Sequence, residues 1–204
     1  MNVFMGILQT FDRFDHWLFQ KINSQWTNSL FDFIFPFLRQ SNFWMPLYLF
    51  VFVFVALNFK RNWWWWIIFF LCTVALTDMT GTRVFKHVFQ RLRPCDDPRF
   101  ASSVRLLLKD CAGGYSFISN HAANHFGLAT FFYFTLRNYL PKWTWIAWLW
   151  AFAIGYAQIY VGIHFPLDVV GGAVVGILFG LAVAMFFNKK FGFANFDRQP
   201  TVAP

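Results

Sequence analysis

The chain has 204 residues, of which 58% are hydrophobic, 24% are aromatic and only 13% are charged. With 31 Phe and 11 Trp it is far too apolar for an ordinary soluble domain of this length. The net charge is +8, but the basic residues do not form a soluble face that a nucleic acid could contact. The composition therefore predicts an integral membrane protein without a nucleic-acid partner.

An amphipathic segment opens the N-terminal region, residues 1–40. Within residues 11–23, apolar side chains recur at helical spacing with charged side chains between them. The apolar set is Phe11, Phe14, Leu18 and Ile22. This pattern predicts a helix lying in the membrane interface. Residues 26–38 are apolar but short and contain Asp32 and Pro36. A re-entrant segment and the lower part of a bent first helix both fit them.

Five later stretches approach the roughly 20 apolar residues that cross a bilayer. They are residues 43–59, 63–77, 122–136, 143–163 and 167–187. We expect an all-α, polytopic transmembrane bundle of about five or six membrane helices over residues 41–190, followed by a C-terminal tail, 191–204. Five spans would bring the loop 91–118 and the turn 164–166 to the same side of the membrane. Glycines 171, 172, 176 and 180, about one helical turn apart, predict close helix packing.

Seven of the 17 Lys and Arg residues lie between Arg83 and Lys109. A basic loop beside a membrane suits anionic lipid headgroups or phosphate, although a solvated loop also fits the charge alone. Cys95 and Cys111 flank this loop and can pair if it faces an oxidising compartment. Paired and free thiols both remain open.

The segment from Lys86 to Pro94 would place two cations on one helical face if a helix continued to Pro94. Lys86 and Arg93 are seven residues apart, about two helical turns, and Arg83 precedes Lys86 by one turn. A lysine point charge and an arginine fork match phosphate oxygens. The alternative is a basic helix end that reaches toward the headgroups.

Two further segments carry histidines at the start of apolar runs. Ser119 or Asn120 would cap a helix whose first turn holds His121, leaving amides that favour a phosphate. His121 could then donate a proton, whereas His125, one turn deeper, is expected to be structural. His164 precedes Pro166 and Asp168, so the carboxylate can orient the imidazole. An incidental N-cap and a buried hydrogen-bonded pair are the alternatives.

Together these segments resemble the type 2 phosphatidic acid phosphatase superfamily of integral membrane phosphatases, over about residues 78–180. Its first motif, K-x6-R-P, is matched by Lys86, Arg93 and Pro94. Its second, P-S-G-H, is matched by Ser119 and His121, with Ile118 and Asn120 at the other two positions. Its third, S-R-x5-H-x3-D, is matched by His164 and Asp168, with Ala157 and Gln158 where Ser and Arg are usual.

The resemblance implies a phosphatase that acts on a phosphomonoester or diphosphate of a lipid without a metal or other cofactor. His164 would be the nucleophile that forms a phosphohistidine, Asp168 its orienting partner and His121 the general acid. Lys86, Arg93, Ser119 and the Asn120 amide would bind the phosphoryl oxygens. A polyprenyl diphosphate, phosphatidylglycerol phosphate, phosphatidic acid or a lipid A phosphate are the expected substrates.

Gln158 departs from this pattern because it carries no charge. We expect another cation to compensate, with Arg83 the first candidate and Arg99 or Arg105 the next. Otherwise the chain is a catalytically weak phospholipid-binding or transport protein. Phosphoryl transfer to an acceptor other than water is a third possibility on the same scaffold.

The expected location is a bacterial inner membrane, with the active site facing the periplasm. The opposite side would hold seven cations and the site side ten. The seven are Lys60, Arg61, Arg137, Lys142, Lys189, Lys190 and Arg198. A raw positive-inside count favours the reverse orientation, so the prediction sets the 83–109 cluster aside as functional. The sequence leaves the oligomeric state open.

Overall fold

The computed structural model describes residues 2–59 and 61–193, and its regular structure over these residues is entirely helical. The main helices are α1 (Asn2–Gln20), α2 (Ser29–Leu38), α3 (Met45–Asn58), α4 (Trp63–Thr80), α5 (Lys86–Phe89), α6 (Asn120–Leu136), α7 (Ile146–Tyr160) and α8 (Pro166–Lys190). Short helices η1 (Lys21–Gln25), η2 (Ser41–Trp44) and η3 (Gly81–Phe85) connect some of them. Nearly all of the expected tail, residues 194–204, lies outside the described residues.

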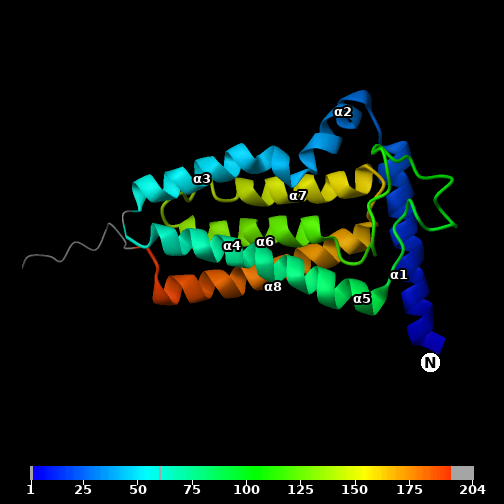
Figure 1. Ribbon diagram of the computed structural model, residues 1–204. Helices are drawn as coiled ribbons and strands as arrows, with labels where there is room; N and C mark the ends of the chain where they lie inside the picture. Colours follow the sequence, from blue (N-terminus) through cyan, green and yellow to red (C-terminus); the bar gives the residue numbers. More distant parts are fainter. Residues whose placement is uncertain (1, 60, 194–204) are drawn as a thin grey trace, which may run out of the picture.

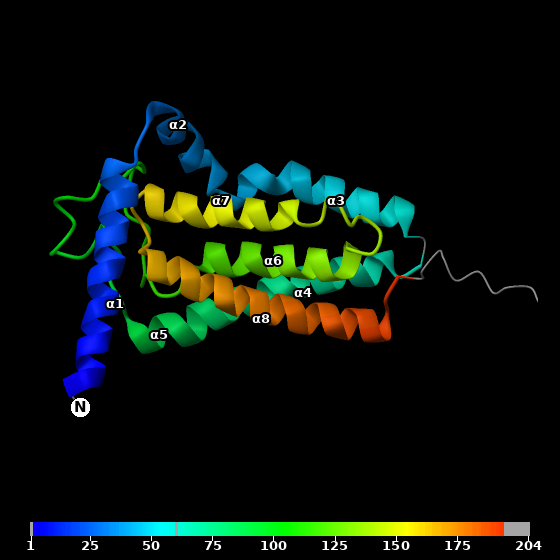
Figure 2. The same ribbon diagram turned by 180° about the vertical axis from the view of Figure 1, so that it is seen from behind.

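The long helices form a bundle that α1 crosses at one end. Helices α3, α4, α6, α7 and α8 run along the length of the molecule, and both views show α1 lying across their ends (Figures 1 and 2). Helix α2 packs beside the end of α7, close to α1. This arrangement agrees with the expected all-α bundle and places α1 where an interfacial helix would lie.

Glycines let the backbones of α6 and α8 touch, as their spacing predicts. A Cβ atom added at Gly176 would lie 2.2 Å from the carbonyl oxygen of Ala123, and one at Gly172 would lie 2.4 Å from that of Ser119. This pair of helices makes the most extensive contact among the described elements. The packing holds the starts of the two helices together, and the Ser119 amide donates to the Asp168 carbonyl at 2.9 Å.

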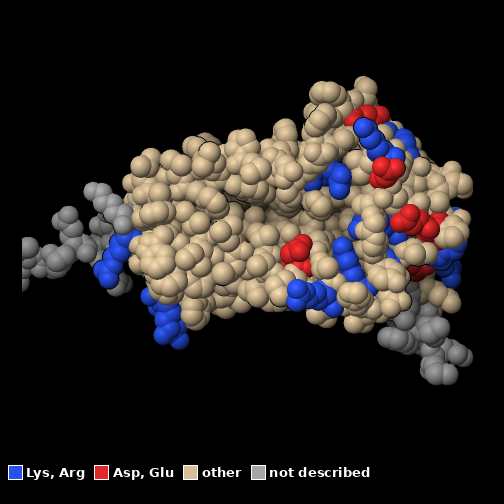
Figure 3. All heavy atoms as spheres, in the orientation of Figure 1, with Lys and Arg blue, Asp and Glu red and all other residues tan. Residues whose placement is uncertain are grey.

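Three helical stretches are long and apolar enough to cross a membrane: Ser41–Asn58, Trp63–Phe89 and Pro166–Lys190. Helices α2 and α7 are also apolar but shorter. Many large apolar side chains are exposed along the bundle, where a soluble protein would present polar ones. Charged side chains gather toward the two ends of the face in Figure 3, with an uncharged zone between them. The chain is an integral membrane protein.

Two predicted segments differ from the structure in extent. The stretch expected over residues 63–77 continues through η3 into α5, so it ends at Phe89 and carries Lys86 on its last turns. Helix α1 begins well before residue 11, and one of its charged residues is buried in the protein. Phe11 and Phe14 are exposed, whereas Asp15 is fully buried beside the core residue Phe19. At an interface the apolar side of such a helix faces lipid, and its opposite side faces the protein.

Candidate active site

The first turn of α8 positions the third motif. Pro166 begins the helix, where its missing N–H group costs no hydrogen bond. Asp168 Oδ2 accepts from the backbone N–H of Phe165 at 2.8 Å and so caps the helix. The same oxygen lies 3.6 Å from Nδ1 of His164. Both side chains are buried, with His164 2% and Asp168 0% exposed.

Ser116 also contacts this pair, although it was not among the sequence candidates. It is fully buried in the loop before α6 and donates its hydroxyl to Asp168 Oδ2. Its oxygen also lies 3.3 Å from His164 Nδ1. Its position three residues before Ser119 was the only available signal. Asp168 Oδ2 therefore accepts hydrogen bonds from the Phe165 amide and the Ser116 hydroxyl beside the imidazole.

Arg93 contacts the other edge of His164. Its Nη1 atom lies 3.0 Å from His164 Nε2 and donates to the Ile163 carbonyl at 3.1 Å. Its remaining hydrogen bonds are to the carbonyls of Gly113 and Gly114, and no carboxylate of the described residues lies within 4.0 Å of it. Because a guanidinium only donates, Nε2 must be the acceptor. We therefore assign the imidazole proton to Nδ1, which faces Asp168.

Burial lowers the pKa of His164 to about 4, despite the opposing effect of Asp168. The imidazole is consequently neutral near pH 7, with the lone pair of Nε2 directed toward Arg93. A neutral imidazole with this tautomer is the form that can attack phosphorus.

The start of α6 brings the second motif to the same place. Ser119 is fully buried, and its hydroxyl caps the helix by accepting from the Ala122 amide at 3.4 Å. His121 lies in the first turn and interacts electrostatically with both His164 and Arg93. The hydrogen bond from the Ser119 amide to the Asp168 carbonyl, 2.9 Å, brings the segments that carry His121 and His164 to the same end of the bundle.

Asn120 turns its side chain away from these groups. Its Nδ2 atom donates to Asp78 Oδ1 at 2.8 Å and to Thr82 Oγ1 at 2.7 Å. Gly81 leaves the space for it, because a Cβ atom there would lie 2.4 Å from Asn120 Oδ1. The side chain that replaces the usual glycine therefore packs against α4 and η3.

Histidine 125 has a structural environment, as expected. It is 2% exposed, and its Nε2 lies 3.2 Å from the Tyr48 hydroxyl. Its Nδ1 lies 2.7 Å from the His121 carbonyl oxygen. Both ring nitrogens are thus engaged one turn below the site.

The three cations expected to compensate for Gln158 do not contact it. Arg83 is exposed on η3, and no hydrogen bond or ion pair joins it to another described residue. Arg99 pairs with Asp97 at 2.7 Å, and Arg105 pairs with Asp32 at 2.6 Å. The cation that does contact Gln158 is Arg39, at the end of α2, with 3.3 Å between Nε and Oε1. The sequence pattern missed it because 119 residues separate the two.

Helix α1 is joined to the site through Arg91. Its Nη1 atom lies 2.8 Å from Asp168 Oδ1, and its Nη2 atom pairs with the buried Asp15. The guanidinium also lies 4.2 Å from the ring centroid of Phe165. Asp15 Oδ1 accepts from the Leu167 amide at 2.7 Å. Neither Asp15 nor Arg91 was a sequence candidate, because the sequence pattern around each predicts a charged side chain in contact with solvent.

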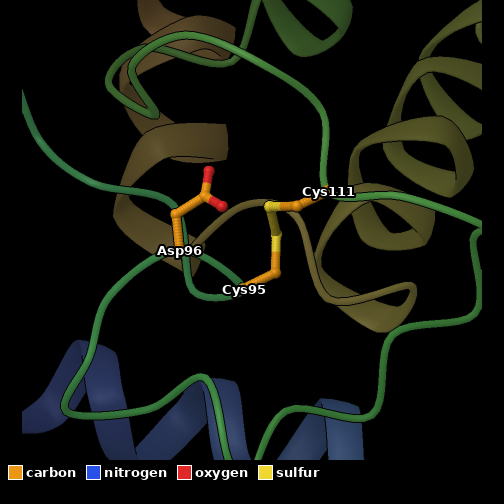
Figure 4. A group of neighbouring side chains, drawn as sticks. All are labelled: Cys95, Asp96 and Cys111. Atoms are coloured by element: carbon orange, nitrogen blue, oxygen red, sulfur yellow. A yellow bond between two sulfur atoms is a disulfide. The ribbon is translucent and has the colours of Figure 1, made fainter.

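The loop between α5 and α6 carries a disulfide. Cys95 and Cys111 are bonded, with 5.9 Å between their Cα atoms (Figure 4). Asp96 lies close to the two sulfur atoms. Because the bond consumes both thiolates, this group does not offer a cysteine metal site. The pairing resolves the alternative that the sequence left open.

Two curated lipid A phosphatases are similar to this chain in sequence. A lipid A 4'-phosphatase from Porphyromonas gingivalis is 34% identical over 110 residues, 54% of this chain and 46% of that protein. A lipid A 4'-phosphatase from Bacteroides thetaiotaomicron is 32% identical over 138 residues, 65% of this chain and 59% of that protein. The chain thus matches about half the length of these curated relatives.

Two crystal structures have a similar fold. LpxE from Aquifex aeolicus superposes with a TM-score of 0.59 at 28% identity, covering 82% of this chain and 93% of that one. A PAP2-type phosphatidylglycerolphosphate phosphatase from Bacillus subtilis gives 0.65 at 23% identity, covering 90% and 88%. The sequence model of the PAP2 superfamily matches residues 63–191, which include all three motifs. The chain belongs to the PAP2 superfamily.

Proposed function

We propose that this protein is a lipid phosphatase that hydrolyses a phosphomonoester or diphosphate through a phosphohistidine. The observation that carries the proposal is the environment of His164. Its Nδ1 is backed by Asp168 and its Nε2 meets Arg93, a buried cation without a carboxylate partner among the described residues. A neutral nucleophile beside an unneutralised cation is suited to a phosphate group.

In the proposed reaction, Nε2 of His164 attacks phosphorus and the bond to the leaving oxygen breaks. His121 donates a proton to that oxygen, and Asp168 stabilises the positive charge that develops on the imidazole. A water molecule then attacks the phosphohistidine and gives its proton to His121, which releases phosphate and restores the nucleophile. Lys86, Arg93 and the first amides of α6 would bind the phosphoryl oxygens throughout.

The apolar surroundings favour a lipid substrate. The site lies at the end of a bundle whose sides expose large apolar residues, so a substrate embedded in the bilayer can present its phosphate there. The curated relatives named above act, by their names, on lipid A, and the solved neighbours include a phosphatidylglycerolphosphate phosphatase. We propose a lipid A type phosphate first and the other lipid phosphates as alternatives.

We further propose that the site faces the periplasm across a bacterial inner membrane. The disulfide between Cys95 and Cys111 lies in the site-side loop and requires an oxidising compartment to persist. The opposite end of the bundle carries Arg137 after α6 and Lys189 and Lys190 at the end of α8. Once the 83–109 cluster is set aside as functional, the positive-inside rule would place these cations in the cytoplasm.

The test is phosphate release from a panel of lipid phosphates in detergent. The parent should release phosphate, and His164→Ala should lose at least about 1,000-fold in rate, because it removes the nucleophile. Asp12→Asn, on the exposed side of α1, is the matched purification control. Equal rates for the parent and His164→Ala eliminate the phosphohistidine. Absence of release from every substrate favours the lipid-binding alternative, and recovery of phosphorylated acceptors in place of phosphate favours a transferase.

A further inference from the structure

Gln158 is fully buried on α7, six residues before His164, where the family resemblance expects an arginine. Its side chain makes two hydrogen bonds with the same residue. Its Oε1 accepts from Arg39 Nε at 3.3 Å, and its Nε2 donates to the Arg39 carbonyl at 3.5 Å. A neutral amide at this position therefore holds a guanidinium that comes from another helix.

The rest of α2 fixes where that guanidinium lies. Tyr160 on α7 donates its hydroxyl to Asp32 on α2 at 2.6 Å, and its ring packs against Phe35 with centroids 4.8 Å apart. Arg39 follows the last residue of α2 and donates its backbone N–H to the carbonyl of Phe35. Tyr160 thus holds the face of α2 that carries Asp32 and Phe35, one turn before Arg39.

Arg39 is a cation without a counterion among the described residues. It is partly buried, and no carboxylate lies within 4.0 Å of it in the described chain. Its electrostatic neighbours are Arg93 and His121, which belong to the proposed site. Burial, with a smaller contribution from the charge of Arg93, lowers the pKa of Arg39. Like charges held together in this way are stabilised when an anion lies between them.

Arg39 differs from three arginines of the 91–118 loop in having no carboxylate partner among the described residues. Arg91, Arg99 and Arg105 each bind a carboxylate, so their charges are satisfied within the protein. Arg39 and Arg93 bind none among the residues described. These five arginines therefore divide into a structural set and a set available to a ligand.

We propose that Arg39 is a phosphate-binding residue, which supplies from α2 the guanidinium that the family's third motif would place at position 158. Gln158 acts as its positioning residue. The bond from Nε to Gln158 leaves Nη1 and Nη2, the fork that binds two phosphate oxygens, without a hydrogen bond to the described residues. This inference rests on the proposed function and adds a residue outside the segment that the family model matches.

The first measurement is the effect of Arg39→Ala on turnover of a lipid phosphate. We expect kcat/KM to fall about 100-fold, because removal of one preorganised donor to a transferring group costs this order of rate. Arg39→Lys should retain part of the rate, since it keeps the charge but loses the fork. Arg137→Ala is the matched control, because this exposed arginine lies at the other end of α6.

The second measurement is rescue. In the Arg39→Ala background, Gln158→Arg restores a guanidinium at the usual family position. We expect kcat/KM of this double variant to be at least tenfold higher than that of Arg39→Ala. A merely structural role for Arg39 would not predict this recovery. Arg39→Ala turnover within threefold of the parent overturns the inference. A loss that Gln158→Arg does not repair, accompanied by an equal loss of folded protein, also overturns it.

A binding readout separates this inference from the proposed function. Orthovanadate should raise the melting temperature of the parent in detergent, and Arg39→Ala should reduce that shift. If the parent binds orthovanadate through Arg39 but releases no phosphate, the anion site stands and the phosphatase proposal fails. If the parent turns over lipid phosphate and Arg39→Ala binds orthovanadate as tightly as the parent, the phosphatase stands and this inference fails.

Discussion

Substitution of Asp15 should damage the active site, although this residue lies on a helix that precedes the family match. Asp15 is fully buried, and its two oxygens join α1 to the first turn of α8. One accepts from the Leu167 amide at 2.7 Å, and the other pairs with Arg91, which in turn binds Asp168 at 2.8 Å. Asp15 therefore supports the carboxylate that orients the proposed nucleophile.

The magnitude follows from these contacts. In Asp15→Ala the buried Leu167 amide loses its acceptor, which costs about 1–3 kcal/mol of unfolding free energy. Arg91 is 22% exposed and keeps Asp168 as its second carboxylate partner, so loss of the pair with Asp15 adds only about 1 kcal/mol. Asp15→Asn keeps an acceptor for Leu167 and should lose roughly the latter amount alone. Displacement of Asp168 should lower kcat by about 10- to 100-fold in the alanine variant.

The assay compares melting in detergent and lipid phosphate turnover for the parent, Asp15→Ala and Asp15→Asn. Asp12→Asn is the control, because Asp12 lies on the same helix and is 53% exposed, 4.0 Å from Arg91. We expect both the stability and the rate to fall from the parent to Asp15→Asn, and to fall further in Asp15→Ala. Parent-like turnover in Asp15→Ala would refute the idea that α1 supports the site through Arg91.

Three further outcomes follow from the structure. Cys95 and Cys111 are 16 residues apart, and their disulfide closes the loop between them. Reduction of this disulfide, or Cys95→Ser, should lower the unfolding free energy by about 3 kcal/mol, measured by melting with and without reductant. The folded-state pKa of His164, about 4, lies below the ordinary 6.5, so the unfolded chain takes up a proton first. Stability from this group is complete above pH 6.5 and falls by about 3 kcal/mol as the pH drops to 4; His164→Gln should flatten that part of the melting profile. Gly176→Ala places a Cβ 2.2 Å from a carbonyl oxygen of α6 and should cost about 1–3 kcal/mol in melting experiments, whereas Gly6→Ala, with no atom within 4 Å, should not destabilise.

The sequence predicted those parts of the site that depend on local chemistry. Pro166 and Asp168 indicate the start of α8, and Ser119 is a favoured N-cap residue that caps α6 in the structure. The glycines of α8 likewise indicated where two backbones meet. In each case the residue type and its near neighbours determine the backbone conformation, so a pattern along the chain is sufficient.

The missed residues act over long separations. Asp15 lies 152 residues from the amide it accepts from, and Arg39 lies 119 residues from Gln158. A charged residue on an amphipathic helix is most often solvated, so burial of Asp15 contradicts the local expectation. Arg83, which the local pattern favoured, lies on an exposed side of η3. Only the packing of α1 and α2 across the end of the bundle distinguishes these cases.

This packing also changes how the N-terminal region is understood. The family match begins at residue 63, yet α1 supports Asp168 through Arg91, and α2 brings Arg39 to Gln158. A division at residue 40 separates side chains that the structure places side by side. If Arg39 replaces the usual arginine, the glutamine at position 158 does not leave the site without that cation. The cation comes from α2 in place of α7. The uncharged Gln158 in the third motif and the packing of α2 on α7 would then act together, because both are needed to hold Arg39 at the site.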